Sequence, residues 1–219
     1  MGAISACIFD LDGVVVDTAK YHYIAWKSLA NGLGFDFTEE DNERLKGVSR
    51  MRSLEILMEI GGVNLDEETQ LKLAAKKNEE YLEYILKMTP EEILPGVKEF
   101  FEDLKNKGIK IALGSASKNA MTILEQLKLT SYFDAIVDGT HVSKAKPDPE
   151  VFLKGAELLN VEPDNCIVFE DAEAGVEAAI NGGMRCVGIG SPDVLNKANF
   201  VVPGFENFSF ETMESEFNK

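Results

Sequence analysis

Six short apolar runs alternate with helical patterns along this chain of 219 residues, and the alternation constrains the fold more than any other feature. Apolar residues recur at helical spacing in the segments between most of these runs. Strands that alternate with helices form a mostly parallel sheet covered on both faces. The sequence therefore predicts an α/β fold with a three-layer, doubly wound, Rossmann-like core. The runs predicted as strands span residues 4–9, 109–113, 135–137, 166–169, 186–189 and 200–202.

The stretch from about Thr18 to Glu92 breaks the alternation, because it contains no strand-like run. Amphipathic spacing over residues 71–85 predicts a long helix, and residues 23–30 predict an earlier one. Thr38, followed by three acidic residues, is typical of a helix start. We therefore expect an all-helical cap domain, residues 17–92, inserted into an α/β core domain formed by residues 1–16 and 93–219.

Charge and composition exclude several kinds of partner. Acidic residues outnumber basic ones by 38 to 22, so the net charge of −16 repels nucleic acid and anionic membranes. The three cysteines are widely spaced in apolar runs, which favours buried thiols over disulfides or a zinc site. The Met1-Gly2 start has no signal-peptide pattern, and Ala6 stands where a myristoylation motif needs Ser or Thr. We expect a cytoplasmic monomer with no membrane partner.

Polar residues follow four of the predicted strands, and the carboxyl ends of parallel strands meet at the edge of the sheet where ligands bind. Three groups come directly after a strand and the fourth lies in the loop beyond one. The groups are Asp10-Leu11-Asp12-Gly13, Ser115-Ala116-Ser117-Lys118-Asn119, Lys144-Ala145-Lys146-Pro147-Asp148-Pro149 and Glu170-Asp171.

These residue types suit phosphate and metal chemistry, although each group also has a plain structural interpretation. Gly13 permits a turn that brings Asp10 and Asp12 to one pocket, but Asp and Gly are also common at ordinary strand exits. The serines and the Glu170-Asp171 pair could instead cap helices. Carboxylates are ligands that Mg²⁺ prefers, and hydroxyl and ammonium groups bind phosphate. Four such groups at one edge favour a site that handles a phosphate and Mg²⁺.

Taken in order, the four groups resemble the motif set of the haloacid dehalogenase superfamily, and the resemblance covers essentially the whole chain. The runs Asp17 to Lys27 and Leu45 to Leu54 are similar to those of its phosphosugar mutases. The resemblance implies a Mg²⁺-dependent conversion of β-glucose 1-phosphate to glucose 6-phosphate through the 1,6-bisphosphate. It makes Asp10 the nucleophile, which becomes an aspartyl phosphate, and Asp12 the general acid and base.

The resemblance also implies the remaining roles. Mg²⁺ is held by Asp10, Glu170, Asp171 and the carbonyl of Asp12. Phosphate is bound by Ser115, Ala116 and Lys146. A larger set binds the sugar substrate or couples its binding to closure of the cap: Thr18, His22, Trp26, Lys46, Gly47, Val48, Arg50, Ser53, Ser117, Lys118 and Asn119. Core packing is the alternative for Trp26, and His141 has no assigned role.

Two other functions stay open at this point. A sugar-phosphate phosphatase would use the same nucleophile but would let water attack the intermediate, and it needs no second phosphate anchor such as Arg50. A non-catalytic sugar-phosphate sensor could dispense with Asp12 or a metal ligand, whereas here all candidate positions are filled.

Overall fold

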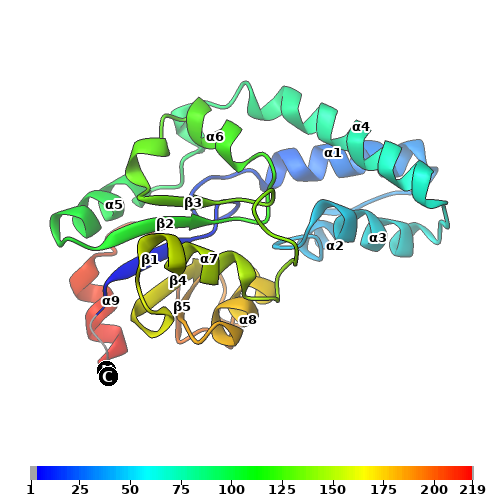
Figure 1. The fold of residues 1–219 in the computed structure, drawn as a ribbon. Helices are drawn as coiled ribbons and strands as arrows, with labels where there is room; N and C mark the ends of the chain where they lie inside the picture. Colours follow the sequence, from blue (N-terminus) through cyan, green and yellow to red (C-terminus); the bar gives the residue numbers. More distant parts are fainter. Residues whose placement is uncertain (1–3, 219) are drawn as a thin grey trace.

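A computed structural model describes residues 4–218 and has a six-stranded, all-parallel sheet at its centre (Figure 1). The strand order is β3-β2-β1-β4-β5-β6, so β1 lies between β2 and β4. This order places the carboxyl ends of β1, β2 and β4 next to one another, because all three strands run in the same direction. The strands are β1 (Ala6–Phe9), β2 (Lys110–Gly114), β3 (Ala135–Val137), β4 (Cys166–Glu170), β5 (Arg185–Ile189) and β6 (Phe200–Val202).

Helices cover both faces of the sheet. On one face lie α5 (Val97–Asn106), α6 (Ala120–Gln126) and α9 (Phe210–Phe217), and on the other lie α7 (Glu150–Leu159) and α8 (Glu173–Asn181). Successive strand residues point to opposite faces, and both faces are covered, so the strands are mainly apolar apart from charged residues at an end of β2, β4 and β5. In β1, Cys7 and Phe9 pack on the first face, whereas Ala6 and Ile8 pack on the second. The short 3-10 turns η2 (Thr130–Tyr132) and η3 (Pro163–Asn165) precede β3 and β4.

Aromatic packing anchors the strand ends that carry the acidic residues. The rings of Phe9 and Phe169 stack with their centroids 4.6 Å apart, and Phe100 meets Phe169 edge-on at 5.4 Å. Phe9 directly precedes Asp10, and Phe169 directly precedes Glu170. The two carboxylates therefore project from a rigid apolar layer.

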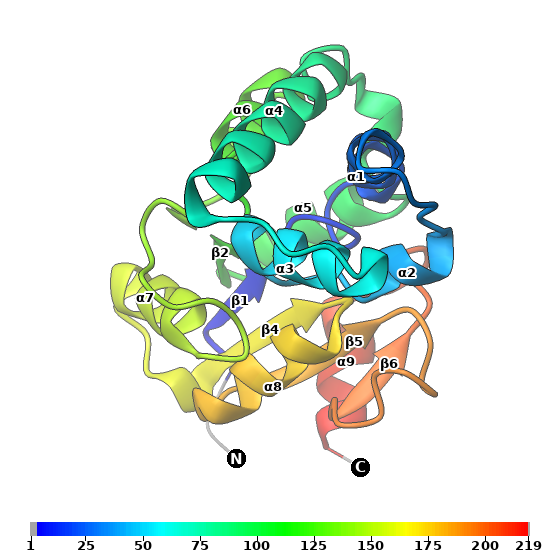
Figure 2. The ribbon, with the colours of Figure 1, turned by 90° about the vertical axis from the view of Figure 1, so that its right-hand side faces the viewer.

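The helices α1 (Ala19–Gly32), α2 (Glu39–Glu43), α3 (Arg50–Gly61) and α4 (Glu67–Ile85) form the helical segment, which lies beyond the carboxyl ends of the strands (Figures 1 and 2). It has a hydrophobic cluster of its own around Trp26, Phe37 and Leu57. The chain enters the helical segment near Asp17 and leaves it near Glu92. These two connections lie side by side, and the N–H of Asp17 donates to the carbonyl of Glu92 at 2.8 Å. The 3-10 turn η1 (Pro90–Glu92) lies on the second connection.

The α/β fold class is confirmed, and so is the absence of strands between Thr18 and Glu92. Thr38 starts α2 with a reciprocal cap, since its hydroxyl accepts from the N–H of Asp41 and its own N–H donates to the Asp41 carboxylate. Some bounds were wrong by one or two residues: β1 starts at Ala6 rather than residue 4, and β2 runs to Gly114. No helix was predicted for α3, which starts within the run Leu45 to Leu54 that resembles the phosphosugar mutases.

Smaller expectations have mixed outcomes. All three cysteines are buried free thiols, as predicted. Within residues 4–218, no helix combines the length and apolarity needed to cross a membrane. The expectation about the Met1-Gly2 start lies outside the described residues. The domain division at residues 17 and 92 stays a prediction.

Candidate active site

Strand register brings the sequence-predicted acidic and hydroxyl residues together. Phe9 pairs with both Leu113 and Phe169, so the residues that follow these three positions lie side by side at the sheet edge. The N–H of Asp10 donates to the carbonyl of Phe169 at 3.0 Å, which extends the β1–β4 ladder by one residue. Asp10 and Ser115 are thus held by backbone geometry rather than by flexible loops.

Lys146 joins this edge from the loop between β3 and α7. Its Nζ donates to Asp10 Oδ1 at 2.7 Å and to Glu170 Oε1 at 2.5 Å, and all three side chains are buried. Burial alone would lower the pKa of Lys146, but the two carboxylates raise it above its usual range. Lys146 therefore stays charged and supplies a fixed cation beside Asp10.

Three carboxylates form a cluster with more negative charge than Lys146 can balance. Oxygens of Asp10, Glu170 and Asp171 lie within 4.8 Å of one another. Burial raises the pKa of Asp10 to about 7 against the opposing effect of Lys146, with Glu170 and Asp12 adding to the rise. Burial and the neighbouring carboxylates also raise the pKa of Asp171 well above its usual range. Oxygen ligands with surplus negative charge fit a bound metal cation.

Two glycines leave room for this cluster. A Cβ on Gly13 would lie 2.1 Å from Asp171 Oδ2, and Gly13 has a φ of +79° that side-chain-bearing residues rarely adopt. A Cβ on Gly175 would lie 1.8 Å from Glu170 Oε1. The backbone therefore approaches two of the three carboxylates so closely that any side chain at either position would displace them.

Asp12 has a different environment from Asp10. Its carboxylate accepts from the Thr18 hydroxyl and lies 3.8 Å from His22 Nε2. Burial alone would raise the pKa of Asp12, but His22 and Thr18 lower it below its usual value. On its other side, His22 Nδ1 contacts Lys77 Nζ at 2.9 Å. Asp10 and Asp12 therefore have pKa values shifted in opposite directions and contact different side chains, which suits two different chemical tasks.

Lys77 was missed by the sequence analysis. It is 3% exposed on α4, and its Nζ lies 4.6 Å from the ring centroids of both Trp26 and Tyr81. Burial lowers its pKa to about 7, with Arg50 as the next cause. A signal was present, because Lys77 falls three residues after Ala74 and four before Tyr81, inside the apolar stripe of the predicted helix.

The helical segment and the sheet edge enclose a cavity of about 490 Å³, called here the main cavity. Most predicted site residues line it, from both sides. They are Asp10, Asp12, His22, Trp26, Lys46, Gly47, Val48, Arg50, Ser53, Ala116, Ser117, Lys118, Asn119, Lys146 and Asp171. Three predicted residues are not in its lining: Thr18, Ser115 and Glu170 are fully buried behind it.

Basic side chains from both the helical segment and the α/β core line the main cavity. Lys46 from the helical segment lies 3.9 Å from Asp171 Oδ2 and 2.8 Å from Glu43 Oε2. Arg50 is the first residue of α3, and it forms no ion pair with any residue between 4 and 218. Lys118 lies in the loop after β2. The cavity therefore has a second group of cations besides Lys146.

The loop after β2 also reaches the helical segment. Asn119 Nδ2 donates to Asn78 Oδ1 of α4 at 2.8 Å, a contact that the sequence analysis missed. Ser115 and Ser117 do not cap a helix, since Asn119 precedes α6 and makes no side-chain cap. The Ser115 hydroxyl instead accepts from the N–H of Ser117 at 3.1 Å. The capping alternative was therefore wrong for both serines.

Asn42 is a further missed residue of the main cavity. It is 7% exposed, and its Oδ1 has no hydrogen-bond partner among the described residues. A buried amide oxygen without a partner costs free energy unless a ligand or water supplies a donor. Asn42 is therefore available to a hydroxyl group of a bound molecule.

The all-parallel sheet, the buried lysine and the carboxylate cluster define a class of Rossmann-like proteins that place an anion beside a metal site. A family model described as haloacid dehalogenase-like hydrolase matches residues 4–183, and the chain belongs to this family. The superfamily resemblance seen in the sequence is thereby confirmed.

Individual relatives show which members of the family this chain is similar to. The chain is 43% identical over 218 residues to a β-phosphoglucomutase from Bacillus subtilis, covering 99% of this chain and 96% of the relative. It is 37% identical over 184 residues to a phosphorylated carbohydrates phosphatase from Thermotoga maritima, covering 83% of each. A crystal structure of β-phosphoglucomutase from Clostridium difficile superposes with a TM-score of 0.94 at 44% identity, covering 98% of this chain and 97% of the other.

Proposed function

We propose that this protein is a β-phosphoglucomutase, which interconverts β-glucose 1-phosphate and glucose 6-phosphate through β-glucose 1,6-bisphosphate. The observation that carries the proposal is the main cavity, which has Lys146 beside Asp10 at one end and additional cations from the helical segment. A bisphosphate needs two such anion sites. The similarity to two β-phosphoglucomutases over nearly the whole chain supports the same function.

Asp10 is the nucleophile in this proposal. One carboxylate oxygen forms a bond to phosphorus as the bond from phosphorus to the sugar oxygen breaks, which leaves an aspartyl phosphate. Lys146, 2.7 Å from Asp10 Oδ1, holds the phosphate oxygens electrostatically. Ser115 and the backbone around Ala116 supply further hydrogen bonds, so the protein contributes position and charge.

Mg²⁺ fits the carboxylate cluster, and Asp10, Glu170, Asp171 and the carbonyl of Asp12 would hold it. When bound, it offsets the negative charge of the phosphate oxygens. The surplus negative charge around Asp171 is the feature of this chain that supports the assignment.

Asp12 moves the proton. It gives a proton to the sugar oxygen as that oxygen leaves phosphorus, and in the reverse step it removes the proton from the attacking hydroxyl. Thr18 and His22 contact its carboxylate and fix its orientation. Lys77 of α4 contacts the His22 ring at Nδ1, and His22 Nε2 lies near Asp12. These two contacts connect α4 to Asp12.

The helical segment supplies the distal half of the substrate site. Arg50, with Lys118 and Asn119 from the core, would bind the phosphate that does not react, and Asn42 would accept a hydrogen bond from a sugar hydroxyl. We infer that residues 17–92 act as a cap domain whose closure excludes water, because water would hydrolyse the aspartyl phosphate. The protein would work as a cytoplasmic monomer.

Product analysis tests the proposal. Purified protein receives Mg²⁺, β-glucose 1-phosphate and a trace of β-glucose 1,6-bisphosphate, and glucose 6-phosphate and inorganic phosphate are measured together. A mutase forms glucose 6-phosphate with little phosphate, and it leaves the α anomer unchanged. Release of phosphate without glucose 6-phosphate would instead establish a phosphatase, the function of the Thermotoga maritima relative.

A further inference from the structure

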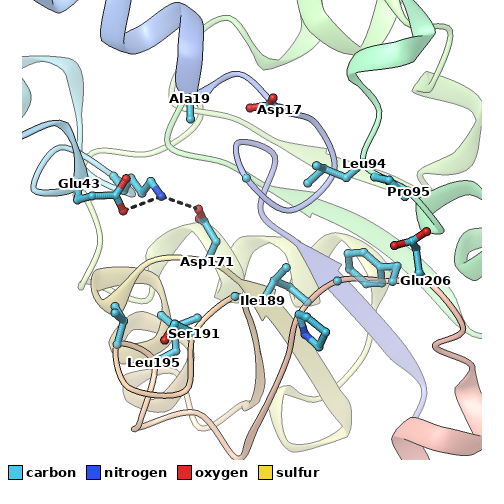
Figure 3. A pocket seen from close by; sticks show the side chains of 17 residues that line it. Asp17, Ala19, Glu43, Leu94, Pro95, Asp171, Ile189, Ser191, Leu195 and Glu206 are labelled. Atoms are coloured by element: carbon cyan, nitrogen blue, oxygen red, sulfur yellow. Dashed lines mark ion pairs between the residues drawn. The ribbon is translucent and has the colours of Figure 1, made fainter. Parts of the chain in front are cut away.

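A second cavity, of about 480 Å³, has Asp171 in its wall, as the main cavity does (Figure 3). Its walls come from the loops after β5 and β6 and from the linker at Leu94 and Pro95. Ser191 and Glu206 are exposed, so the cavity opens to solvent. None of the residues to which the proposed function assigns the phosphate or the sugar lines it, although Lys46, which the family resemblance places in the sugar site, does.

The two cavities share a wall. Gly13, Ala19, Lys46 and Asp171 line both. Asp171 belongs to the carboxylate cluster, so the cluster can be approached from either side. From the main cavity, however, a bound sugar phosphate would lie between the solvent and the cluster. The second cavity keeps an approach to Asp171 that a substrate does not occupy.

The charges of the two linings are opposite. The main cavity has six basic residues against three acidic ones, and the basic residues still outnumber the acidic ones by five to three without Lys77, whose pKa burial lowers to about 7. The basic set is Lys46, Arg50, Lys77, Lys118, Lys144 and Lys146, and the acidic set is Asp10, Asp12 and Asp171. The second cavity has four acidic residues, Asp17, Glu43, Asp171 and Glu206, against Lys46. Low-dielectric walls of one charge sign concentrate ions of the opposite sign. The main cavity therefore attracts anions, and the second cavity attracts cations.

Lys46 stands at the shared wall. Its ammonium bridges Glu43 at 2.8 Å and Asp171 at 3.9 Å, and Figure 3 draws both ion pairs. An ammonium beside Asp171 opposes a cation that arrives there. Because Glu43 is already the closer partner of Lys46, movement of the ammonium away from Asp171 would free that carboxylate and keep the pair with Glu43.

We propose that the second cavity is the passage by which a divalent cation reaches and leaves the carboxylate cluster, with Lys46 as its gate. The inference rests on the metal site of the proposed function, but it assigns a new role to the loops after β5 and β6. It separates the path of the cation from that of the sugar phosphate, so that metal exchange continues while the main cavity is filled.

The rates of Mn²⁺ binding test this passage in the full-length protein with the main cavity filled by a saturating, non-reacting sugar phosphate, because the cluster can otherwise be reached from either cavity. Mn²⁺ accepts the same carboxylate ligands as Mg²⁺. Its dissociation is followed by stopped flow with an excess of a metallochromic chelator, and its affinity by equilibrium titration. The matched variants are Ser191→Trp, at the rim of the second cavity, and Ser143→Trp, at the rim of the main cavity. We expect Ser191→Trp to slow association and dissociation equally, at least about tenfold, with unchanged affinity, and Ser143→Trp to leave both rates unchanged.

Charge variants give an independent arm that does not depend on a bulky side chain. The double variant Asp17→Asn with Glu206→Gln should slow Mn²⁺ association about threefold at low ionic strength, and the difference should vanish at high salt. Lys144→Gln, on the main cavity, should leave the rate unchanged. Slowing in the Ser143→Trp protein, or unchanged rates in both the Ser191→Trp protein and the double variant, overturns the passage. Failure of the wild-type protein to bind Mn²⁺ overturns both the passage and the metal site, whereas mutase activity is judged separately by product analysis.

Discussion

The sheet edge and the helical segment both contribute to the main cavity, but they hold their polar groups in different ways. At the sheet edge, Asp10, Lys146 and Glu170 are each at most 4% exposed, and Lys146 contacts both carboxylates directly. In the helical segment, Lys77 is as deeply buried, but the side chains of Lys46 and His22 are 32% and 30% exposed. The difference agrees with the proposal that the sheet edge performs the chemistry and that the helical segment selects the substrate and excludes water.

The largest loss is expected at the centre of the sheet edge. Asp10→Asn removes the nucleophile but keeps the shape of the side chain, so we predict a fall in turnover on the order of 10⁵-fold. Steady-state formation of glucose 6-phosphate measures it. Asp17→Asn, shortly after the motif that contains Asp10 but with its side chain 49% exposed, is the matched control and should stay within about threefold. Equal losses in the two variants would contradict the special position of Asp10.

Asp12→Asn tests the proton carrier at the point where the two regions meet. General acid–base catalysis contributes about 10²- to 10⁴-fold, so kcat should fall by that factor while KM changes little. Isothermal titration with a non-reacting sugar phosphate checks that binding is retained. A variant with wild-type kcat would remove Asp12 from the mechanism.

Arg50→Gln tests the helical segment alone. Loss of a charged hydrogen bond to the distal phosphate should lower kcat/KM for β-glucose 1-phosphate about 10- to 100-fold. Hydrolysis of the aspartyl phosphate should persist, so the ratio of phosphate to glucose 6-phosphate should rise. The matched control is Arg52→Gln, since Arg52 pairs with Glu55 and Glu59 on the surface. The comparison of the two regions fails if Arg52→Gln changes the product ratio as much.

The smallest effect concerns stability and comes from Lys77. Its pKa is lowered to about 7 by burial and Arg50, against the opposing effects of Asp12 and Glu80, and His22 faces it from α1. Between this value and the ordinary 10.5, the unfolded chain binds a proton on Lys77 that the folded protein lacks. The free energy of unfolding should therefore rise with pH above 7.

The slope from this one group is at most about 1.4 kcal/mol per pH unit. Denaturant unfolding at pH 7, 8 and 9 measures it as the difference between wild type and Lys77→Met. The matched control, Lys76→Met, changes the exposed neighbour and should keep the wild-type slope. A slope of wild-type size in the Lys77→Met protein would contradict a largely neutral Lys77.

The sequence predicted the two regions unequally. Asp10, Ser115 and Glu170 follow apolar strands, and parallel strand ends must meet, so their convergence could be inferred without coordinates. Lys77 and Asn42 could not be placed in this way, because their positions depend on how four helices pack over the sheet. Periodicity gives the buried face of a helix, but it does not say which cavity that face meets.

Local geometry set a further limit on prediction. Gly13 was expected to permit a turn, which its φ of +79° bears out. The fit of its backbone against Asp171 depends on residues 158 positions apart in the chain and has no local signal. The Asn119–Asn78 contact and the second cavity are likewise products of tertiary packing.

The fate of a labelled phosphate tests the division between the two regions most directly. The protein is mixed with β-glucose 1,6-bisphosphate that carries ³²P, in the presence of Mg²⁺ and β-glucose 1-phosphate, and quenched samples are resolved into sugar phosphates, inorganic phosphate and labelled protein. We predict that label passes through Asp10 and appears almost entirely in sugar phosphates. Label that never appears on Asp10, or that leaves it mainly as inorganic phosphate in the wild-type protein, would contradict a mutase in which the helical segment excludes water.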